Sequence, residues 1–360
     1  MVRMLLVIKK TIPLLPHIFL YATTVGQPTL PTFKLQGIDD NFYENKDFNK
    51  NGNLGIVFLS NHCRISQKFQ DHLIEIKQKV QNTENDFFAV SPNLETTIAP
   101  DEQSYSEVGD SFEEMKLRSR FKNYNFHFLY DGKKQKLTNG LNVNVTPMAF
   151  VFNSDRKMVY RGRIGRHDGK QRTNDMDFYK ALTNDNTNKN LIQTPTYGSA
   201  IKSVNDIGET EAKIKRYSKE TIKLSILEKR NVDFIKNIGI GKLKLIYIWT
   251  KNDADNRHNL LSISNIHKIY RKRGLAVITI CIDQKENCDL IKRELENSQM
   301  SAINYLIEGK DFSPLSTLLS HSIKALTPFC VLMKQNTVIY QKDEKIDKLQ
   351  LRRKIVNLLE

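Results

Sequence analysis

The chain has 360 residues, and its 55 basic residues outnumber its 40 acidic residues, for a formal net charge of +15. Hydrophobic residues make up 39% and charged residues 26%, which excludes wholesale disorder. At roughly 150 residues per domain, this length favours two domains. The four cysteines are too few for a disulfide scaffold and lack zinc-site spacing, so we expect no metal and no other cofactor.

The first 26 residues have the layout of a secretory signal. Basic residues precede an uncharged apolar stretch, Thr11 to Val25, and small residues precede Gln27. The stretch is too short for a membrane span, and no second long apolar run follows. We therefore expect residues 1–26 to be a signal peptide, the protein to be exported to a periplasmic or extracellular location, and the mature chain to have no membrane span. The alternative is a poorly ordered leader.

A buried strand followed by a helix is predicted early in the chain. Leu54 to Leu59 is a continuous apolar run, typical of a central strand, and it stops at the polar turn Ser60 to Cys63. Apolar residues then recur at helical spacing from Ser66 to Val80. Further along we predict a strand over Asp86–Val90, a helix capped by Ser111 with Glu114 as the reciprocal acceptor, and a hairpin of Met148–Phe152 with Met158–Tyr160.

The second half repeats this plan. Its predicted elements, in order, are a strand over Leu243–Trp249, a helix from Leu260 to Tyr270, a strand over Gly274–Ile280, a hairpin of Phe329–Met333 with Val338–Tyr340, and a last helix from Leu349 to Leu358. Each hairpin begins with the same dipeptide, Thr146-Pro147 and Thr327-Pro328. The repeated order predicts a duplicated domain type.

The segment between the two copies is hydrophilic and has helical spacing. We therefore predict four parts: the signal peptide, a first domain over residues 27–202, a connecting and mainly helical segment over 203–236, and a second domain over 237–360. The predicted fold class is α/β, with a mixed central sheet flanked by helices in each domain.

Residues 54–202 resemble the redoxin branch of the thioredoxin superfamily, which is related to alkyl hydroperoxide reductase and thiol-specific antioxidant proteins. The matching pieces are Val57–Ser66, Val145-Thr146-Pro147, Val159–Ile164 and Thr194–Gly198. Residues 240–360 resemble the thioredoxins of exported thiol-disulfide oxidoreductases. The pieces there are Trp249, Ala325–Pro328, Ile346-Asp347 and Leu351–Ile355. The resemblance implies two tandem thioredoxin-like folds.

In the first domain the resemblance implies that Cys63 is the reactive thiol at the start of a helix, where the helix dipole and free amides stabilise a thiolate. It implies that Pro147 is a cis proline facing the sulfur and the substrate. The usual second cysteine is absent: one alignment puts Ser66 in its place, and another puts Ser60 in the place of the first. Ser199 stands where the family often has a further cysteine.

Ser60 to Cys63 also resembles the Thr-x-x-Cys loop of peroxiredoxins, although Ile56 replaces the proline of that pattern. We therefore expect an exported redoxin, a single-cysteine thiol oxidoreductase or thiol-dependent peroxidase. Ser60 and His62 would support Cys63, and the partners would be an external thiol reductant or a thiol or disulfide protein substrate. His62 has an alternative role as a solvated loop residue.

In the second domain, Asp253 and Asn256 stand at the places of the paired cysteines, and Pro328 at that of the cis proline, so this site should be vestigial and redox-silent. Trp249 would line a peptide groove or simply pack in the core. We expect no disulfide between Cys281 and Cys288.

The alternative to an enzyme is a non-catalytic scaffold, two thioredoxin folds that hold a partner at vestigial grooves. The basic stretch from Arg156 to Arg172 is the best candidate for binding nucleic acid. Its Tyr160–Arg163 piece is ordinary redoxin sequence and the rest is typical of a basic hairpin and loop, so no nucleic-acid partner is expected.

Overall fold

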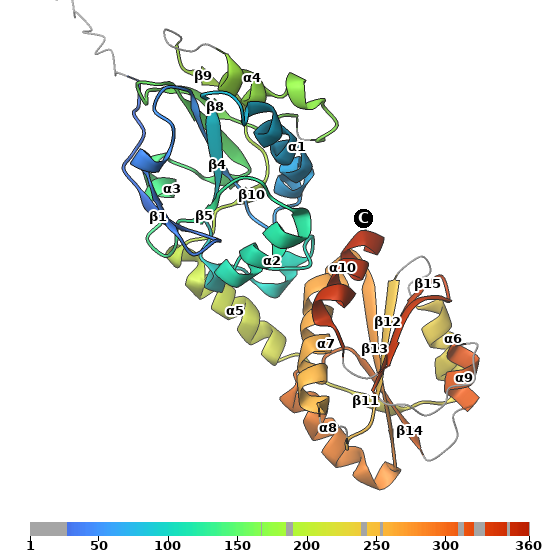
Figure 1. Cartoon of the computed structure of the whole chain (residues 1–360). Coiled ribbons are helices and arrows are strands. Elements are labelled where there is room, and N and C mark those ends of the chain that lie inside the picture. Colours follow the sequence, from blue (N-terminus) through green and yellow to red (C-terminus); the bar gives the residue numbers. More distant parts are fainter. Residues whose placement is uncertain are drawn as a thin grey trace, which may run out of the picture.

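The computed structural model describes residues 27–166, 168–184, 190–238, 243–252, 255–308, 313–319, 328–343 and 346–359. Within these ranges the chain forms two units, each with its own large sheet and helices, and Figure 1 shows α5 (Ile207–Ser218) running between them. The predicted signal peptide lies outside the described residues. No helix within them is long and apolar enough to cross a membrane.

The first unit is built on an eight-stranded sheet. Its strands, in spatial order, are β2 (Phe42–Glu44), β1 (Lys34–Gly37), β5 (Phe128–Tyr130), β4 (Asp86–Ser91), β3 (Leu54–Phe58), β7 (Met148–Phe152), β8 (Met158–Gly162) and β9 (Ile192–Gln193). A separate two-stranded sheet pairs β6 (Val145–Thr146) antiparallel with β10 (Ser199–Ala200).

The second unit is built on a six-stranded sheet. Its spatial order is β11 (Leu224–Ile226), β14 (Ile303–Glu308), β13 (Leu275–Asp283), β12 (Leu243–Trp249), β15 (Phe329–Lys334) and β16 (Thr337–Asp343). The two sheets share a core order, β5-β4-β3-β7-β8 in one and β14-β13-β12-β15-β16 in the other. In both, three parallel strands continue into an antiparallel hairpin. The predicted α/β class with mixed sheets is confirmed.

Helices flank both sheets. In the first unit they are α1 (Arg64–Val80), α2 (Phe112–Lys122), α3 (Lys136–Gly140) and α4 (Asp177–Thr183). In the second they are α6 (Lys229–Asn237), α7 (Asn256–Tyr270), α8 (Cys288–Asn297), α9 (Ser313–Leu319) and α10 (Lys348–Leu359). Single 3-10 turns occur at Asn45–Asp47, Glu95–Thr97, Pro100–Gln103, Thr173–Asp175, Val204–Asp206, Arg271–Arg273 and Lys285–Asn287. Ser111 caps α2 as predicted, and its hydroxyl donates to the Glu114 carboxylate.

The central strands are buried along their whole length, as their apolar sequences predict. Every residue of β3 and of β12 is buried, and apolar clusters cover both faces of each sheet. The side chain of Trp249, at the end of β12, is fully buried in the second core. Of its two predicted roles, the structure therefore shows packing.

The connecting segment differs from the expectation at its C-terminal end. Residues 203–236 contain α5, but they also contain β11, which pairs in parallel with β14. They include most of α6 as well, where Val232 and Ile235 are buried in the second core. The second unit therefore begins before residue 237, because β11 and α6 complete its sheet and core.

Polar contacts join the two units at the loop that precedes α2. The Tyr270 hydroxyl donates to the Ser106 carbonyl over 2.7 Å, and Arg352 reaches the same carbonyl at 3.3 Å. The Arg353 guanidinium stacks 3.8 Å from the centre of the Phe121 ring. Figure 1 shows α10, which carries both arginines, beside the first unit and close to α2.

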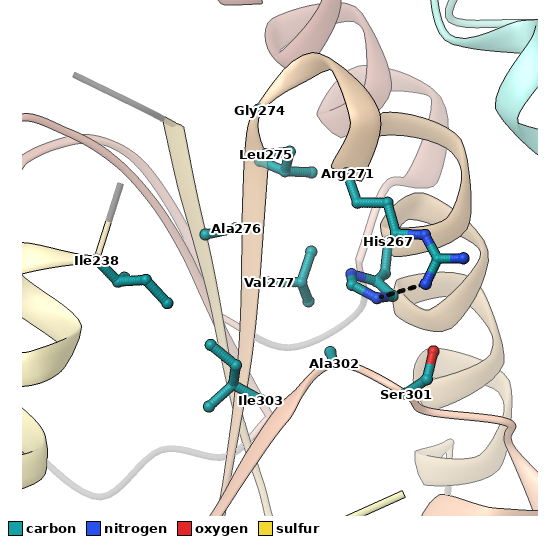
Figure 2. Close-up of a pocket in the computed structure, with 10 residues that line it drawn as sticks. All are labelled: Ile238, His267, Arg271, Gly274, Leu275, Ala276, Val277, Ser301, Ala302 and Ile303. Atoms are coloured by element: carbon teal, nitrogen blue, oxygen red, sulfur yellow. Dashed lines mark hydrogen bonds between the residues drawn. The ribbon is translucent and has the colours of Figure 1, made fainter. Parts of the chain in front are cut away.

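The second unit has a hollow of its own, about 270 Å³ in volume, between α7 and strands β13 and β14 (Figure 2). His267 and Arg271 are its titratable groups, and Glu220 holds the Arg271 guanidinium at 2.6 Å. Burial and the charge of Arg271 lower the pKa of His267 to about 4. The imidazole is therefore neutral at physiological pH.

Candidate functional site

Cys63 caps the first long helix of the first unit. The apolar strand β3 ends at Phe58, the chain turns through polar residues, and α1 begins directly after Cys63. The backbone N–H of Ser66 points at the Cys63 sulfur from 3.5 Å. Unpaired amides in the first turn of a helix, together with its dipole, favour a negative charge there. The local sequence therefore places a thiol where a thiolate is stabilised.

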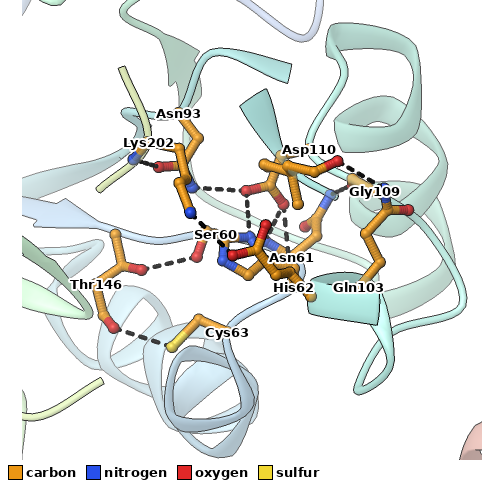
Figure 3. Close-up of polar contacts among 12 residues, drawn as sticks. Ser60, Asn61, His62, Cys63, Asn93, Gln103, Gly109, Asp110, Thr146 and Lys202 are labelled. Carbon is orange, nitrogen blue, oxygen red and sulfur yellow. Dashed lines mark hydrogen bonds and ion pairs between the residues drawn. The ribbon is translucent and has the colours of Figure 1, made fainter. Parts of the chain in front are cut away.

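The chain before β7 covers this sulfur from the other side. The Thr146 carbonyl accepts a hydrogen bond from the Cys63 thiol at 2.9 Å, and the Thr146–Pro147 peptide bond is cis (Figure 3). The Ser60 hydroxyl lies 2.7 Å from that of Thr146, so it bonds to the segment preceding Pro147. Pro147 is buried, and strand β10 runs beside β6 over this segment.

Ser199 of β10 also acts on the pKa of the Cys63 thiol through hydrogen bonding. Burial opposes ionisation, but hydrogen bonds from Ser199 and Ser66 offset it, and the pKa of Cys63 lies below its usual value. The thiol proton can thus bond to Thr146, and after its loss the sulfur can accept from the two serines. Ser199 and Ser66, the two positions where the resemblance expects cysteines, both contact the one cysteine that remains.

His62 is not a solvated loop residue: its side chain is only 5% exposed. Its Nδ1 atom lies 2.8 Å from a carboxylate oxygen of Asp110, whose side chain is fully buried. Burial disfavours the imidazolium, yet the charge and hydrogen bond of Asp110 outweigh it and raise the pKa of His62. The imidazolium in turn lowers the pKa of Asp110, against the effect of burial.

Asp110 organises the whole turn before Cys63. One of its oxygens accepts from the backbone N–H groups of Asn61 at 2.7 Å and His62 at 3.1 Å, and the other accepts from the Asn93 side chain at 2.7 Å. Asn93 also accepts from the Lys202 N–H at 2.9 Å, which ties the segment leading away from β10 to this network (Figure 3). The backbone that presents Cys63 is therefore fixed from several sides.

A cleft opens beside the sulfur; we call it the Cys63 cleft. It has a volume of about 510 Å³ and is lined by His62–Ile65, Asp101, Glu102, Ser104, Tyr105, Gly198–Ala200 and Lys202. Cys63 forms part of its wall although its side chain is 0% exposed. A reactant in this cleft would meet Ser199 and the Gly198 backbone, with Pro147 behind them.

Replacing Ser199 with alanine should raise the pKa of Cys63, because the thiolate loses a donor while its burial stays the same. Alkylation of Cys63 by iodoacetamide at pH 7 should slow severalfold, and the limiting rate at high pH should be unchanged. The rate is measured over a pH series by mass spectrometry of the Cys63 peptide. Ser218→Ala, at the exposed end of α5, is the matched control. An unshifted pH profile in Ser199→Ala would contradict the role given to this hydroxyl.

The other cysteines lie in different surroundings. Cys281 and Cys330 are buried in the second core, and burial raises the pKa of Cys330 to about 12. Cys288 is half-buried at the start of α8, and all four cysteines are free in the structure. In the described part of the chain, no cluster of three potential ligands could hold a metal ion.

The second unit has no thiol at the corresponding helix start. Asp255 caps α7 there, and Asn256 is buried in the first turn. Pro328 is half-buried and directly precedes β15, whereas Asp253 and Thr327 lie outside the described residues.

The structure thus brings Ser60, His62, Cys63 and Pro147 together, and it adds Ser199. Sequence reasoning missed Asp110 and Asn93, which hold the turn in place. The one available signal was indirect: Asn93 follows a predicted strand, and Asp110 precedes the cap residue Ser111.

Neither a protein-family model nor a curated protein sequence matches this chain. Among solved structures, it is similar to an uncharacterised conserved protein from Geobacillus kaustophilus, with 25% identity over 49% of this chain and 91% of that one and a TM-score of 0.39. A thioredoxin-family thiol:disulfide interchange protein from Chlorobium tepidum is 11% identical over 43% and 97%, with a TM-score of 0.34. A secreted disulfide oxidoreductase from Mycobacterium tuberculosis is 12% identical over 35% and 79%, with a TM-score of 0.28.

Proposed function

We propose that this protein is a single-cysteine thiol–disulfide oxidoreductase of the redoxin type, with Cys63 as its nucleophile. The observation that supports this most is the position of the Cys63 sulfur: it caps α1, accepts from Ser66 and Ser199, and lines an open cleft. The helix cap and the two donors are features that lower a thiol pKa, and the cleft brings a reactant up to the wall that Cys63 forms.

The chemistry needs one external thiol. The Cys63 thiolate attacks a disulfide, a new bond forms to one sulfur, and the other sulfur leaves as a thiolate. A second thiolate then attacks the mixed disulfide and releases Cys63. With a peroxide, the Cys63 thiolate would instead attack one oxygen: the O–O bond breaks, Cys63 becomes the sulfenic acid, and the other oxygen leaves as water or an alcohol. Ser60 and His62 hold the turn that presents the sulfur, and the backbone at Pro147 supports it from behind.

The test is the alkylation of the native full-length chain by iodoacetamide at neutral pH, followed by mass spectrometry of each cysteine peptide. Cys63 should label fastest, and the buried Cys281 and Cys330 should label only after unfolding. Half-buried Cys288 is the internal reference, and Cys63→Ser identifies the fast phase. If Cys63 labels no faster than Cys288, or labels only on unfolding, the enzyme proposal fails.

A non-catalytic scaffold is the second candidate, and two observations favour it. The Cys63 side chain has no exposed surface, and α7 of the second unit begins without a thiol. Failure of the labelling test would make this the better account.

A further inference from the structure

A second cleft, which we call the Arg353 cleft, lies between the two units. Its volume is about 510 Å³. Residues of α1, of the loop before α2 and of α2 form one wall, and α10 of the second unit forms the other. Five of its lining side chains are basic and one is acidic: Arg64, Lys68, Arg118, Lys122, Arg353 and Glu107. A site with this balance attracts anions.

The Arg353 cleft adjoins the Cys63 cleft. Arg64 and Tyr105 line both, and Arg64 directly follows Cys63 in the chain. The Arg64 guanidinium lies 5.2 Å from the centre of the Tyr105 ring, so these two side chains form the partition between the clefts. A molecule held in the Arg353 cleft therefore has a short path to the Cys63 sulfur in the Cys63 cleft.

Two residues that line the Arg353 cleft each have a buried polar atom with no hydrogen-bond partner among the described residues. The two atoms are Nε of Arg353, a donor, and Oε1 of Glu107, an acceptor. Glu107 is 3% exposed, and its other oxygen is held by Arg118 at 2.6 Å. Buried polar groups are nearly always paired, so these two atoms indicate that the site accommodates a molecule with both an acceptor and a donor.

These features specify the chemistry of that molecule. Carboxylates would pair with Arg353 and Lys122, and an amide or ammonium N–H would donate to Glu107. We propose that the Arg353 cleft binds the carboxylate-bearing part of a small, anionic, peptide-like disulfide or thiol, whose sulfur reaches Cys63. The second unit then has a role without chemistry, because α10 supplies one wall of the binding site. The thiol–disulfide exchange at Cys63 rests on the proposed function, whereas the binding in the Arg353 cleft does not.

The test compares three disulfides on the full-length chain: glutathione disulfide (anionic), 2-hydroxyethyl disulfide (neutral) and cystamine (cationic). In each reaction the Cys63–sulfur bond forms as the probe disulfide breaks, and half of the probe leaves as a thiolate. Wild type should react faster with the anionic probe than with the cationic one. Arg353→Gln should slow the reaction with the anionic probe and so reduce that ratio by about three- to tenfold.

Two further variants sharpen the comparison. Lys122→Gln, on the opposite wall, should reduce the ratio in the same direction, which guards against misfolding of Arg353→Gln alone. Arg293→Gln is the matched control, since Arg293 is exposed on α8 of the same unit. High salt should also weaken the preference for the anion.

Binding is measured separately by calorimetry with S-methylglutathione, which cannot react with Cys63. Binding to wild type that is weakened in Arg353→Gln supports the cleft, even if Cys63 proves inert and the proposed function fails. Conversely, if Cys63 reacts with the neutral disulfide but shows no charge preference and the chain does not bind S-methylglutathione, the cleft proposal is overturned and the proposed function stands.

Discussion

Asp110→Ala should lower the free energy of unfolding by about 3–5 kcal/mol, because it removes one member of a buried ion pair and leaves the other without compensation. The carboxylate accepts from His62 Nδ1, from two backbone N–H groups and from Asn93, and its side chain has no exposed surface. Each of these donors loses its partner together with the charge. Asp110→Asn keeps the shape and one acceptor, so its loss should be smaller.

The loss of unfolding free energy in Asp110→Ala should also depend on pH, in a defined direction. The pKa of His62 is raised in the folded state from its usual 6.5. The stabilisation that the charged His62–Asp110 pair gives the fold is therefore complete below about pH 6.5 and is lost as the pH rises through the folded pKa of His62. The gap between wild type and Asp110→Ala should accordingly be larger at pH 6 than at pH 9. It should not vanish at pH 9, since neutral His62 still donates to the carboxylate.

Urea unfolding, followed by circular dichroism and by tryptophan fluorescence, measures this gap. The single tryptophan, Trp249, lies in the second unit, so a loss seen first by circular dichroism belongs to the first unit. Asp131→Ala is the matched control. Asp131 is also buried, but its partners are Thr138 and backbone N–H groups of α3. The difference in unfolding free energy between wild type and Asp131→Ala should be equal at pH 6 and pH 9. A gap for Asp110→Ala that grows between pH 6 and pH 9 would contradict the ion pair.

Local pattern made much of the fold predictable. The run that became β3 is apolar at every position, and α1 shows helical spacing, so one window of sequence fixes each of them. The edge strand β11 is three residues long and only partly buried, too short to show a period, and it became visible only through its pairing with β14. The boundary of the second unit shifted for this reason.

The residues of the candidate site likewise fall into those that the sequence predicts and those that only the fold reveals. Cys63, Ser60 and His62 are neighbours in the chain, and the resemblance names Ser199 and Pro147. Asp110 lies 48 residues from His62 and is one acidic residue among many in the sequence. No local pattern reveals that pairing, because the tertiary fold alone brings the carboxylate under the turn.

The loop between β4 and α2 links the site to the second unit. Asn93 and Asp110 near its two ends hold the Cys63 turn, while Ser104 and Ser106 between them accept from Arg273 and Tyr270 over 2.7 Å. The second unit therefore contacts the segment that positions the candidate nucleophile. Through this loop, a unit without a thiol at α7 is in contact with the segment that carries the proposed site at Cys63.

Gly198→Ala should disrupt the site and destabilise the first unit by about 3–5 kcal/mol. Gly198 has φ of +152°, and a Cβ atom there would lie 1.8 Å from the Thr146 carbonyl oxygen. The backbone would have to move, which separates Ser199 from Thr146 in the β6–β10 pairing.

The same movement takes the Ser199 donor away from the sulfur, so the pKa of Cys63 should rise and its alkylation at pH 7 should slow. Urea unfolding and the iodoacetamide pH profile measure the two effects in one preparation. Gly208→Ala is the matched control, because a Cβ at Gly208 on α5 meets nothing within 4 Å and alanine is the better helix former. If Gly198→Ala is as stable as Gly208→Ala and keeps the wild-type pH profile, the close approach of β10 to Thr146 does not hold Ser199 at Cys63.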